Sequence, residues 1–498
     1  MTRLLAAALA AAALGAGVLA VNAGAATPTG LSACALGRLP SAVRTFLPDA
    51  IARGQRRFGA SLRGLGAGDR ARAQATFAAG VAAYLYGYAP ETLRLTVQRF
   101  PVNQFVGIAQ LATASARAIV APNHDTLYSV SQLDLSAGPI VIDAPATGGR
   151  YSILQLIDAY TNDFAYIGAG AQRDRAESVA IVPPGWSGAL PDGVRRVDSP
   201  TNLVWLLGRT LIDGQADLPA ARQVLSGYAL TPLSQWAAGA RSTPLILDAF
   251  PGRVATPRLP TGLAFYDALG QNLAANPPPP GDACGLQSFA AAGIGAGQTP
   301  STSADALSAR ALTAAAAAGR RLVDAGATAL RRDSQRRHNG WDLLTRDIGR
   351  FGSDYIGRAV TAHVGLAANT PDQALYPNTD TDSRGRLLDG RHDYVVSFPR
   401  GGLPPVRSFW SLTLYGANRL FVRNAIDRYA LGDRTRGLRY GPGRSLQILV
   451  QHRPPPSGRQ SNWLPAPSGR FFLYLRLYEP KPAAVDGRWT PPTVRRVG

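Results

Sequence analysis

Pro139–Asp143 (PIVID) and Tyr151–Asp158 (YSILQLID) decide the fold class, because each is a short apolar run that ends in an aspartate. Ala165–Gly168 and Val179–Val182 continue the pattern, with Pro, Gly and Asp between the runs. Short runs separated by turn residues are typical of the strands of a small all-β sandwich. Residues 118–240 are therefore predicted to form a β-sandwich domain.

A second β region is predicted at residues 351–498. Its apolar runs are separated by long loops rich in Pro and Gly, and they are Tyr394–Phe398, Ser408–Tyr415, Ser445–Gln451 and Phe471–Tyr478. Long loops between paired strands are typical of a jelly roll, so this region is predicted to be one.

Two other regions are predicted to be helical. In residues 27–117, Ala71–Val97 carries apolar residues at three-to-four spacing, and Asp69 is placed to act as its N-cap. In residues 241–350, an alanine-rich helix is predicted after the Pro-rich loop 276–281, which is expected to be a semi-rigid surface segment. The whole chain is therefore predicted to be a mixed, mainly β fold.

Residues 1–26 have the pattern of a secretory signal peptide. Arg3 provides the positive start, Leu4–Val21 is apolar, and Ala23-Gly24-Ala25 provides small residues for cleavage after Ala25 or Ala26. An uncleaved membrane anchor is the alternative, because about 18 apolar residues is the lower limit for spanning a bilayer. We expect an exported protein, either secreted or associated with the cell envelope.

The chain has two cysteines, Cys34 and Cys284. In an oxidising compartment two cysteines most simply form one disulfide, and a Cys34–Cys284 bridge is the favoured prediction. The alternative is that Leu31-Ser32-Ala33-Cys34 is a lipobox with Cys34 as the acylated first residue of a lipoprotein. Against it, the polar stretch Asn22–Gly30 separates this sequence from the apolar run.

The formal net charge is +20, and almost all the positive charge is arginine, with Lys481 as the lone lysine. The arginines are scattered, with local clusters at Arg56-Arg57, Arg331-Arg332 and Arg336-Arg337. A nucleic-acid binder would concentrate them among stacking aromatic residues, so no specific nucleic-acid partner is predicted. Nonspecific attraction to an anionic envelope surface is physically reasonable.

Two long, ordered sets of motifs resemble a known pair of families. The segment Ala121-Pro122-Asn123-His124-Asp125-Thr126-Leu127-Tyr128, with Arg150-Tyr151, Gly185-Trp186 and Ser199-Pro200-Thr201-Asn202, resembles the domain of unknown function 1254. Asp354-Tyr355 through Arg358-Ala359, Leu388-Asp389-Gly390, Phe409-Trp410-Ser411-Leu412-Thr413, Arg428-Tyr429 and Asn462-Trp463-Leu464-Pro465-Ala466-Pro467 resemble its companion, the domain of unknown function 1214. The resemblance implies a helical N-terminal part, an immunoglobulin-like sandwich, a helical insert, a C-terminal jelly roll and an exported location. It implies no reaction.

Catalytic motifs are scarce in the sequence. Gly185-Trp186-Ser187-Gly188 lacks the final glycine of a nucleophile elbow, and no histidine has a partner at metal-ligand spacing. No metal and no cofactor are predicted. The catalytic candidates are His124, Asp125 and Asp158, which could supply acid–base groups. The alternative is that these aspartates build turns.

The candidate ligand-binding residues lie in loops and at strand ends. Asn123, Asp125 and Tyr128 belong to the polar run that precedes a strand, and Trp463 lies in a Pro-rich loop where side chains are free to contact ligands. Arg358 and Arg428 are candidate anchors for an anion.

Three hypotheses of function remain open on the sequence alone. The favoured one is an exported, envelope-associated protein that binds a small or amphiphilic ligand between its two β domains. The second is a carbohydrate- or ester-directed hydrolase that uses Asp125 or Asp158 with His124. The third is a structural surface protein without a pocket. Whether the protein is an enzyme is left open.

Overall fold

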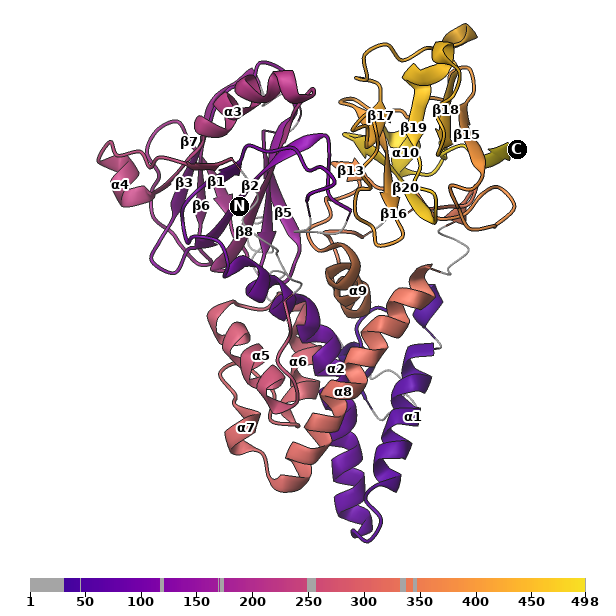
Figure 1. The fold of residues 1–498 in the computed structure, drawn as a ribbon. Coiled ribbons are helices and arrows are strands. Elements are labelled where there is room, and N and C mark those ends of the chain that lie inside the picture. The colour runs from indigo at the N-terminus through magenta and orange to yellow at the C-terminus, as the bar shows by residue number, and fades with distance from the viewer. Residues whose placement is uncertain are drawn as a thin grey trace, which may run out of the picture.

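The computed structural model describes residues 31–44, 46–116, 121–168, 170, 174–248, 257–331, 337–343 and 347–497. The predicted signal peptide lies outside these residues. The described chain is a mixed fold of one helical body and two β-sandwiches, which confirms the predicted fold class. Figure 1 shows the helical body below and the two β bodies side by side above it.

The first β body contains strands β1–β10, in which a six-stranded sheet of order β10-β1-β2-β8-β4-β5 packs on a four-stranded sheet of order β7-β6-β3-β9. Leu156 and Leu206 of one sheet and Ile142 and Ile181 of the other share a single apolar core. The strands are β1 Val106–Ile108, β2 Thr126–Asp134, β3 Ile140–Ala144, β4 Ser152–Asp158, β5 Asp163–Ile167, β6 Glu177–Val182, β7 Val194–Asp198, β8 Leu203–Leu211, β9 Ala229–Pro232 and β10 Leu245–Leu247, with helices α3 Leu218–Ser226 and α4 Leu233–Ala237 between them.

The second β body contains strands β11–β21. A sheet of order β11-β12-β14-β20-β16-β17, with β13 beside β20, packs on a four-stranded sheet of order β19-β18-β15-β21. Leu412 and Leu475 meet Val396 and Ile448 in its core, so the predicted two-sheet sandwich is present, and jelly-roll connectivity stays a prediction. The elements are β11 Arg337–His338, β12 Trp341–Asp342, β13 Ala374–Leu375, β14 Asn378–Thr379, β15 Asp393–Phe398, β16 Trp410–Gly416, β17 Ala430–Gly432, β18 Leu446–Gln451, β19 Trp463–Pro465, β20 Phe471–Tyr478, α10 Pro482–Val485 and β21 Val494–Val497.

The helical body joins segments that are far apart in the sequence around one apolar core. Gly80 shows how close its helices approach, because a Cβ atom there would lie 2.8 Å from Ala315 on the neighbouring helix. No helix of the described residues is long and apolar enough to cross a membrane. The helices are α1 Phe46–Ala60, α2 Ala67–Val97, α5 Leu263–Ala275, α6 Ala283–Ala290, α7 Pro300–Ser303, α8 Ala306–Arg331 and α9 Tyr355–Gly365.

The prediction that Asp69 caps α2 is wrong. The helix begins at Ala67, and Gly66 is its N-cap. Asp69 therefore lies in the first turn, where its carboxylate still interacts favourably with the positive end of the helix dipole.

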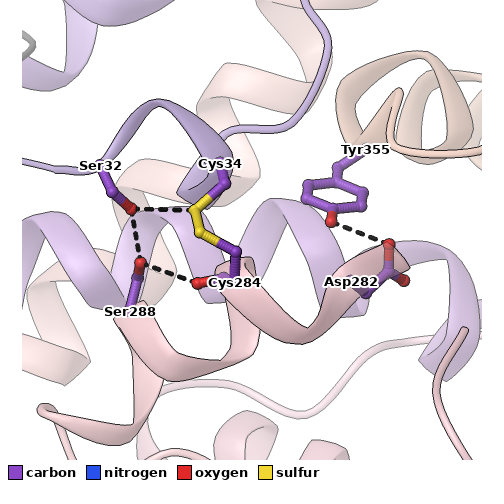
Figure 2. Close-up of a disulfide and its surroundings, with 6 residues drawn as sticks. All are labelled: Ser32, Cys34, Asp282, Cys284, Ser288 and Tyr355. Atoms are coloured by element: carbon purple, nitrogen blue, oxygen red, sulfur yellow. Dashed lines mark hydrogen bonds between the residues drawn. A yellow bond between two sulfur atoms is a disulfide. The ribbon is translucent and has the colours of Figure 1, made fainter. Parts of the chain in front are cut away.

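The predicted disulfide between Cys34 and Cys284 is present, with a Cα–Cα distance of 5.8 Å. Figure 2 shows how it fastens the segment around Cys34 to α6, where Ser32 Oγ also lies 2.7 Å from Ser288 Oγ. Because the sulfur of Cys34 is part of this bond, it is not available for the thioether of a lipoprotein.

Candidate functional site

The polar segment Ala121–Tyr128 lies between the two β bodies. Asn123 is 4% exposed, and its Nδ2 donates to the Tyr478 hydroxyl of β20 at 2.7 Å and to Thr126 Oγ1 at 2.9 Å. Its Oδ1 accepts from the backbone N–H of Asp125 at 2.7 Å. Asn123 therefore builds the turn before β2 and also binds this turn to the second β body.

Asp125 forms an ion pair across the same interface. One carboxylate oxygen accepts from Arg434 Nη2 at 2.9 Å, and the other accepts from Ser411 Oγ at 2.5 Å. The guanidinium of Arg434 also lies over the Phe409 ring, 4.4 Å from its centroid. The negative charge of Asp125 is thus balanced by a cation of the second β body.

His124 packs against aromatic residues of the second β body. Its Nδ1 donates to the Ala112 carbonyl oxygen at 2.7 Å. The ring stands edge-on to Phe421 and Tyr429, with centroid distances of 5.8 and 5.2 Å. These contacts hold the imidazole in place.

A buried arginine on β20 faces this interface. Arg476 is 5% exposed and donates to Thr413 Oγ1, to the Tyr415 hydroxyl and to the Ala121 carbonyl oxygen at 2.7–2.9 Å. All three acceptors are neutral.

A second buried arginine faces the interface from the first β body. Arg209 of β8 is 6% exposed and donates to Gln155 Oε1 at 2.7 Å, Asn369 Oδ1 at 3.2 Å and the Ala367 carbonyl oxygen at 2.9 Å. These acceptors are also neutral. The carboxyl group of Asp163 is connected to Arg209 through Gln155. Gln155 accepts from Arg209 through Oε1 and donates to Asp163 through Nε2 at 2.7 Å.

Asp163 is itself a perturbed acid. Burial raises its pKa to about 7, against the opposing effect of its hydrogen bonds from Gln155 and Tyr166. At neutral pH this carboxyl is therefore only partly charged and compensates Arg209 incompletely.

Tyr128 lies near both arginines. It is the direct cross-strand neighbour of Arg209 in the β2–β8 ladder, and both Arg209 and Arg476 act electrostatically on its hydroxyl. Burial raises the pKa of this phenol. Tyr128 and Tyr376 are partly exposed residues of this interface. We call Asn123, Tyr128, Arg209, Tyr376, Arg476 and Tyr478 the interdomain polar cluster.

The other predicted site residues lie elsewhere. Asp158 at the end of β4 is buried, accepts from the backbone N–H groups of Tyr160 and Asn162 at 2.8 Å, and also accepts from the Asn162 side chain. These are the contacts of the turn-building alternative. Burial raises the pKa of Asp158 as well.

Arg358 lies on α9 in the helical body and is 0% exposed. Its guanidinium faces the rings of Tyr86, Tyr355 and Tyr160 at 5.0, 5.1 and 5.8 Å, and none of its nitrogens has a hydrogen-bond partner among the described residues. Tyr86 and Tyr355 both donate to Asp282, so a carboxylate lies directly behind two of these rings. The three tyrosine rings and Asp282 together stabilise the Arg358 cation without a direct ion pair.

Arg428 and Trp463 meet at an edge of the second β body. Arg428 donates to the Trp463 carbonyl oxygen at 2.9 Å, and the Trp463 indole donates to the Gln451 carbonyl oxygen at 2.8 Å. Trp463 is buried and belongs to the four-stranded sheet, whereas Asn123 binds the seven-stranded sheet. The structure therefore gathers Asn123, Asp125 and Tyr128, and it places Trp463 on another sheet.

Sequence reasoning missed Arg209 and Arg476. Each is the only charged residue of an otherwise apolar strand, LVWLLGRTL in β8 and FFLYLRLY in β20. Because arginine is almost never fully buried unless it is paired, a lone arginine in such a strand was the signal that pointed to the site. No group of three His, Cys, Asp or Glu side chains within the described ranges could hold a metal ion.

Two family models match parts of this chain. Residues 102–232 match the family described as "Protein of unknown function (DUF1254)", and residues 373–482 match "Protein of unknown function (DUF1214)", which confirms the resemblance noted in the sequence. All six residues of the interdomain polar cluster fall within these two ranges. No protein of curated function matches the sequence.

Two solved structures are similar to this chain. The VPA0106 protein from Vibrio parahaemolyticus is 23% identical, with a TM-score of 0.66, and the match covers 85% of this chain and all of that one, which shows a shared fold alone. An uncharacterised protein from Burkholderia cenocepacia is 14% identical over 90% of this chain and 94% of that one, and its TM-score of 0.38 carries no argument.

Proposed function

The chain joins a DUF1254 region to a DUF1214 region, and we propose that it is an exported protein that binds a small anionic or amphiphilic ligand at the junction of the two. The observation that carries the proposal is the pair of buried arginines, Arg209 and Arg476. Arg209 lies beside Tyr128 on the neighbouring strand of the same sheet, and Arg476 lies on β20 of the second β body. Among the described residues, the hydrogen-bond acceptors of both guanidinium groups are neutral.

The charge balance of the interface favours an anion. A buried cation without a counter-charge costs several kcal/mol, unless a charged or strongly polar partner supplies compensation. Asp125 is paired with Arg434 and also acts electrostatically on Arg476, so one carboxylate serves two arginines, and Asp163 has a pKa of about 7. A carboxylate or phosphate group would supply further negative charge to the two arginines, and guanidinium groups bind both with paired hydrogen bonds.

The surroundings also favour an apolar portion of the ligand. Tyr151, Phe409 and Tyr478 form an aromatic cluster between the two sheets, with Phe409 and Tyr478 stacked at 4.1 Å. The side chains of Leu211 and Tyr166 pack at its edge and are half-buried. An acidic head group on the arginines would therefore place a short hydrocarbon chain against aromatic and aliphatic side chains.

Export is part of the proposal. Its support is the signal-peptide pattern of residues 1–26 together with the Cys34–Cys284 disulfide, because structural disulfides persist in oxidising compartments.

The hydrolase alternative has less support, since Asp125 is held by Arg434 and Asp158 is held by backbone N–H groups of its own turn.

Calorimetric titration of the mature protein tests this function with octanoate, inorganic phosphate and octanol as probes. We expect octanoate or phosphate to bind and octanol to bind more weakly than octanoate. Arg209→Gln and Arg476→Gln should each weaken anion binding at least tenfold, about 1.4 kcal/mol, because each removes one charge from the site. Tyr128→Phe should weaken it less, because it removes only a hydroxyl group.

Arg470→Gln is the matched control, because it removes an exposed arginine of the second β body. It should leave binding unchanged. If neither anionic probe binds, or if all the arginine variants lower affinity equally, the proposed function is contradicted.

A further inference from the structure

The end of the helical body farthest from the two β bodies carries a basic surface. Arg53, Arg56 and Arg57 are exposed on α1, and their spacing of three and four residues puts them on one face of the helix. Arg63, in the turn between α1 and α2, is exposed beside them. Figure 1 shows this turn at the lower end of the molecule, away from the interdomain polar cluster. We call these four arginines the basic tip.

The charges of the basic tip face water. Among the described residues, the ion pairs of this region join Arg72 to Asp69 and Asp305, and none involves the four arginines. The opposite face of α1 is buried through Leu47, Ile51 and Phe58. The helix therefore needs its apolar face for packing and leaves the arginine face available.

An apolar hollow lies next to the basic tip. It has a volume of about 560 Å³ between the end of α1 and the start of α8, and its lining includes Phe58, Ala309, Ala314 and Ala317. Arg310 borders it and donates to the Ser61 carbonyl oxygen at 3.1 Å. In the turn itself Leu65 is 38% exposed. Unpaired cations and accessible apolar surface therefore occur together at this end of the molecule.

We infer that the basic tip docks the protein on the surface of a bilayer that contains anionic phospholipid. Arginines near such a surface bind the lipid phosphates electrostatically, and each contributes roughly a fivefold increase in partitioning, about 1 kcal/mol. Leu65 and the hollow would accept apolar parts of the lipid at the interface. A nucleic acid fits less well, because base stacking needs exposed rings. The rings at this end, Phe58 and Phe77, are buried and stacked on each other at 5.3 Å.

Vesicle co-sedimentation of the mature full-length protein tests this inference. The probes are vesicles of phosphatidylglycerol mixed with phosphatidylcholine and vesicles of phosphatidylcholine alone. The wild type should bind only the anionic vesicles, and binding should fall as NaCl is raised from about 0.1 to 0.5 M. The triple variant Arg53→Gln/Arg56→Gln/Arg57→Gln should partition roughly tenfold to a hundredfold less. Glutamine has a helix propensity close to that of arginine, so α1 should stay folded.

The control is Arg436→Gln/Arg453→Gln/Arg470→Gln, which removes the same charge from exposed positions of the second β body. It should reduce vesicle binding less than threefold. Equal losses in the two triple variants would overturn the inference in favour of net charge alone. Absence of wild-type binding to anionic vesicles would overturn it too. The same holds if the wild type binds no vesicles but binds a single-stranded RNA oligonucleotide that the basic-tip variant does not bind. Leu65→Asn should weaken vesicle binding by a smaller factor, and circular dichroism checks that each variant is folded.

Discussion

Asn123 and Asp125 make contacts both within their own turn and with the second β body. Both belong to a polar run that sequence patterns identify as turn-forming, and the backbone N–H of Asp125 does donate to Asn123 Oδ1. Their contacts with the second β body could not be predicted, because Asn123 and Tyr478 are separated by 355 positions and local patterns report only neighbouring residues. The side chains that form the turn also join the domains.

Replacing Asp125 by Asn should weaken the interface. The change leaves Arg434 without its closest counter-charge, and breaking a buried pair typically costs about 3–5 kcal/mol. Because the Arg434 side chain is 23% exposed, we expect a smaller loss of about 2–3 kcal/mol in the free energy of unfolding, measured by urea denaturation. Ser411→Ala, which removes one neutral donor, should cost about 1 kcal/mol. A loss below about 0.5 kcal/mol for Asp125→Asn would contradict a stabilising role for this pair.

Asp163 should make stability depend on pH. Its pKa is about 7 in the folded protein and near 3.8 when unfolded, so the folded state holds a proton that the unfolded state releases between these values. The free energy of unfolding should therefore fall as pH rises from about 4 to 7, by at most a few kcal/mol from this residue. Thermal melts between pH 4 and 8 measure this dependence.

Asp163→Asn should flatten the pH dependence, because the side chain can no longer titrate. Burial raises the pKa of Asp354 to about 6 and that of Asp158 as well, so part of the slope should remain. The exposed Asp192→Asn is the control and should leave the slope unchanged. An identical slope in wild type and Asp163→Asn would show that Asp163 does not titrate in this range.

At the scale of elements, the apolar runs predicted β3, β4, β5, β6, β15, β16, β18 and β20, whereas short strands such as β11–β14 and the pairing of the strands were not predicted. The apolar runs at Tyr151–Asp158 and Phe471–Tyr478 correspond to β4 and β20, because strand length and bounding turn residues are local properties. The partner of a strand depends on long-range packing. Phe409 and Trp410 illustrate the limit, since alternation predicts opposite faces, but only the structure shows that Phe409 faces the first β body.

The disulfide links α6 covalently to the segment around Cys34. The two cysteines are 250 positions apart, so their bond restricts a long loop of the unfolded chain. This restriction should contribute roughly 2–5 kcal/mol to the free energy of unfolding. Asp282, two residues before Cys284, accepts hydrogen bonds from both Tyr86 and Tyr355. The double variant Cys34→Ser/Cys284→Ser should therefore lose amide-exchange protection in α6 before either β body does. Unchanged protection of α6 in hydrogen-exchange mass spectrometry would contradict this role.

At the scale of the whole molecule, the sequence indicates the order of helical and β regions, and the structure adds how they join. Helices that precede the first β body in the sequence and helices that follow it build one apolar core, and no local pattern predicts this. The same arrangement makes a candidate site from two sheets, because Arg209 of one β body and Arg476 of the other both act electrostatically on Tyr128. The basic tip lies at the other end of the molecule (Figure 1), so ligand binding and surface docking would use separate parts of the chain.

Native mass spectrometry of the mature protein tests the central claim most directly, by asking what the wild type carries and what Arg209→Gln/Arg476→Gln no longer carries. We predict that the wild type holds an acidic small molecule, retained on purification or taken up from octanoate or phosphate. The double variant should be folded and free of it. A folded wild type that stays bare under both conditions, or a double variant that keeps the same ligand, would contradict an anion site between the two β bodies.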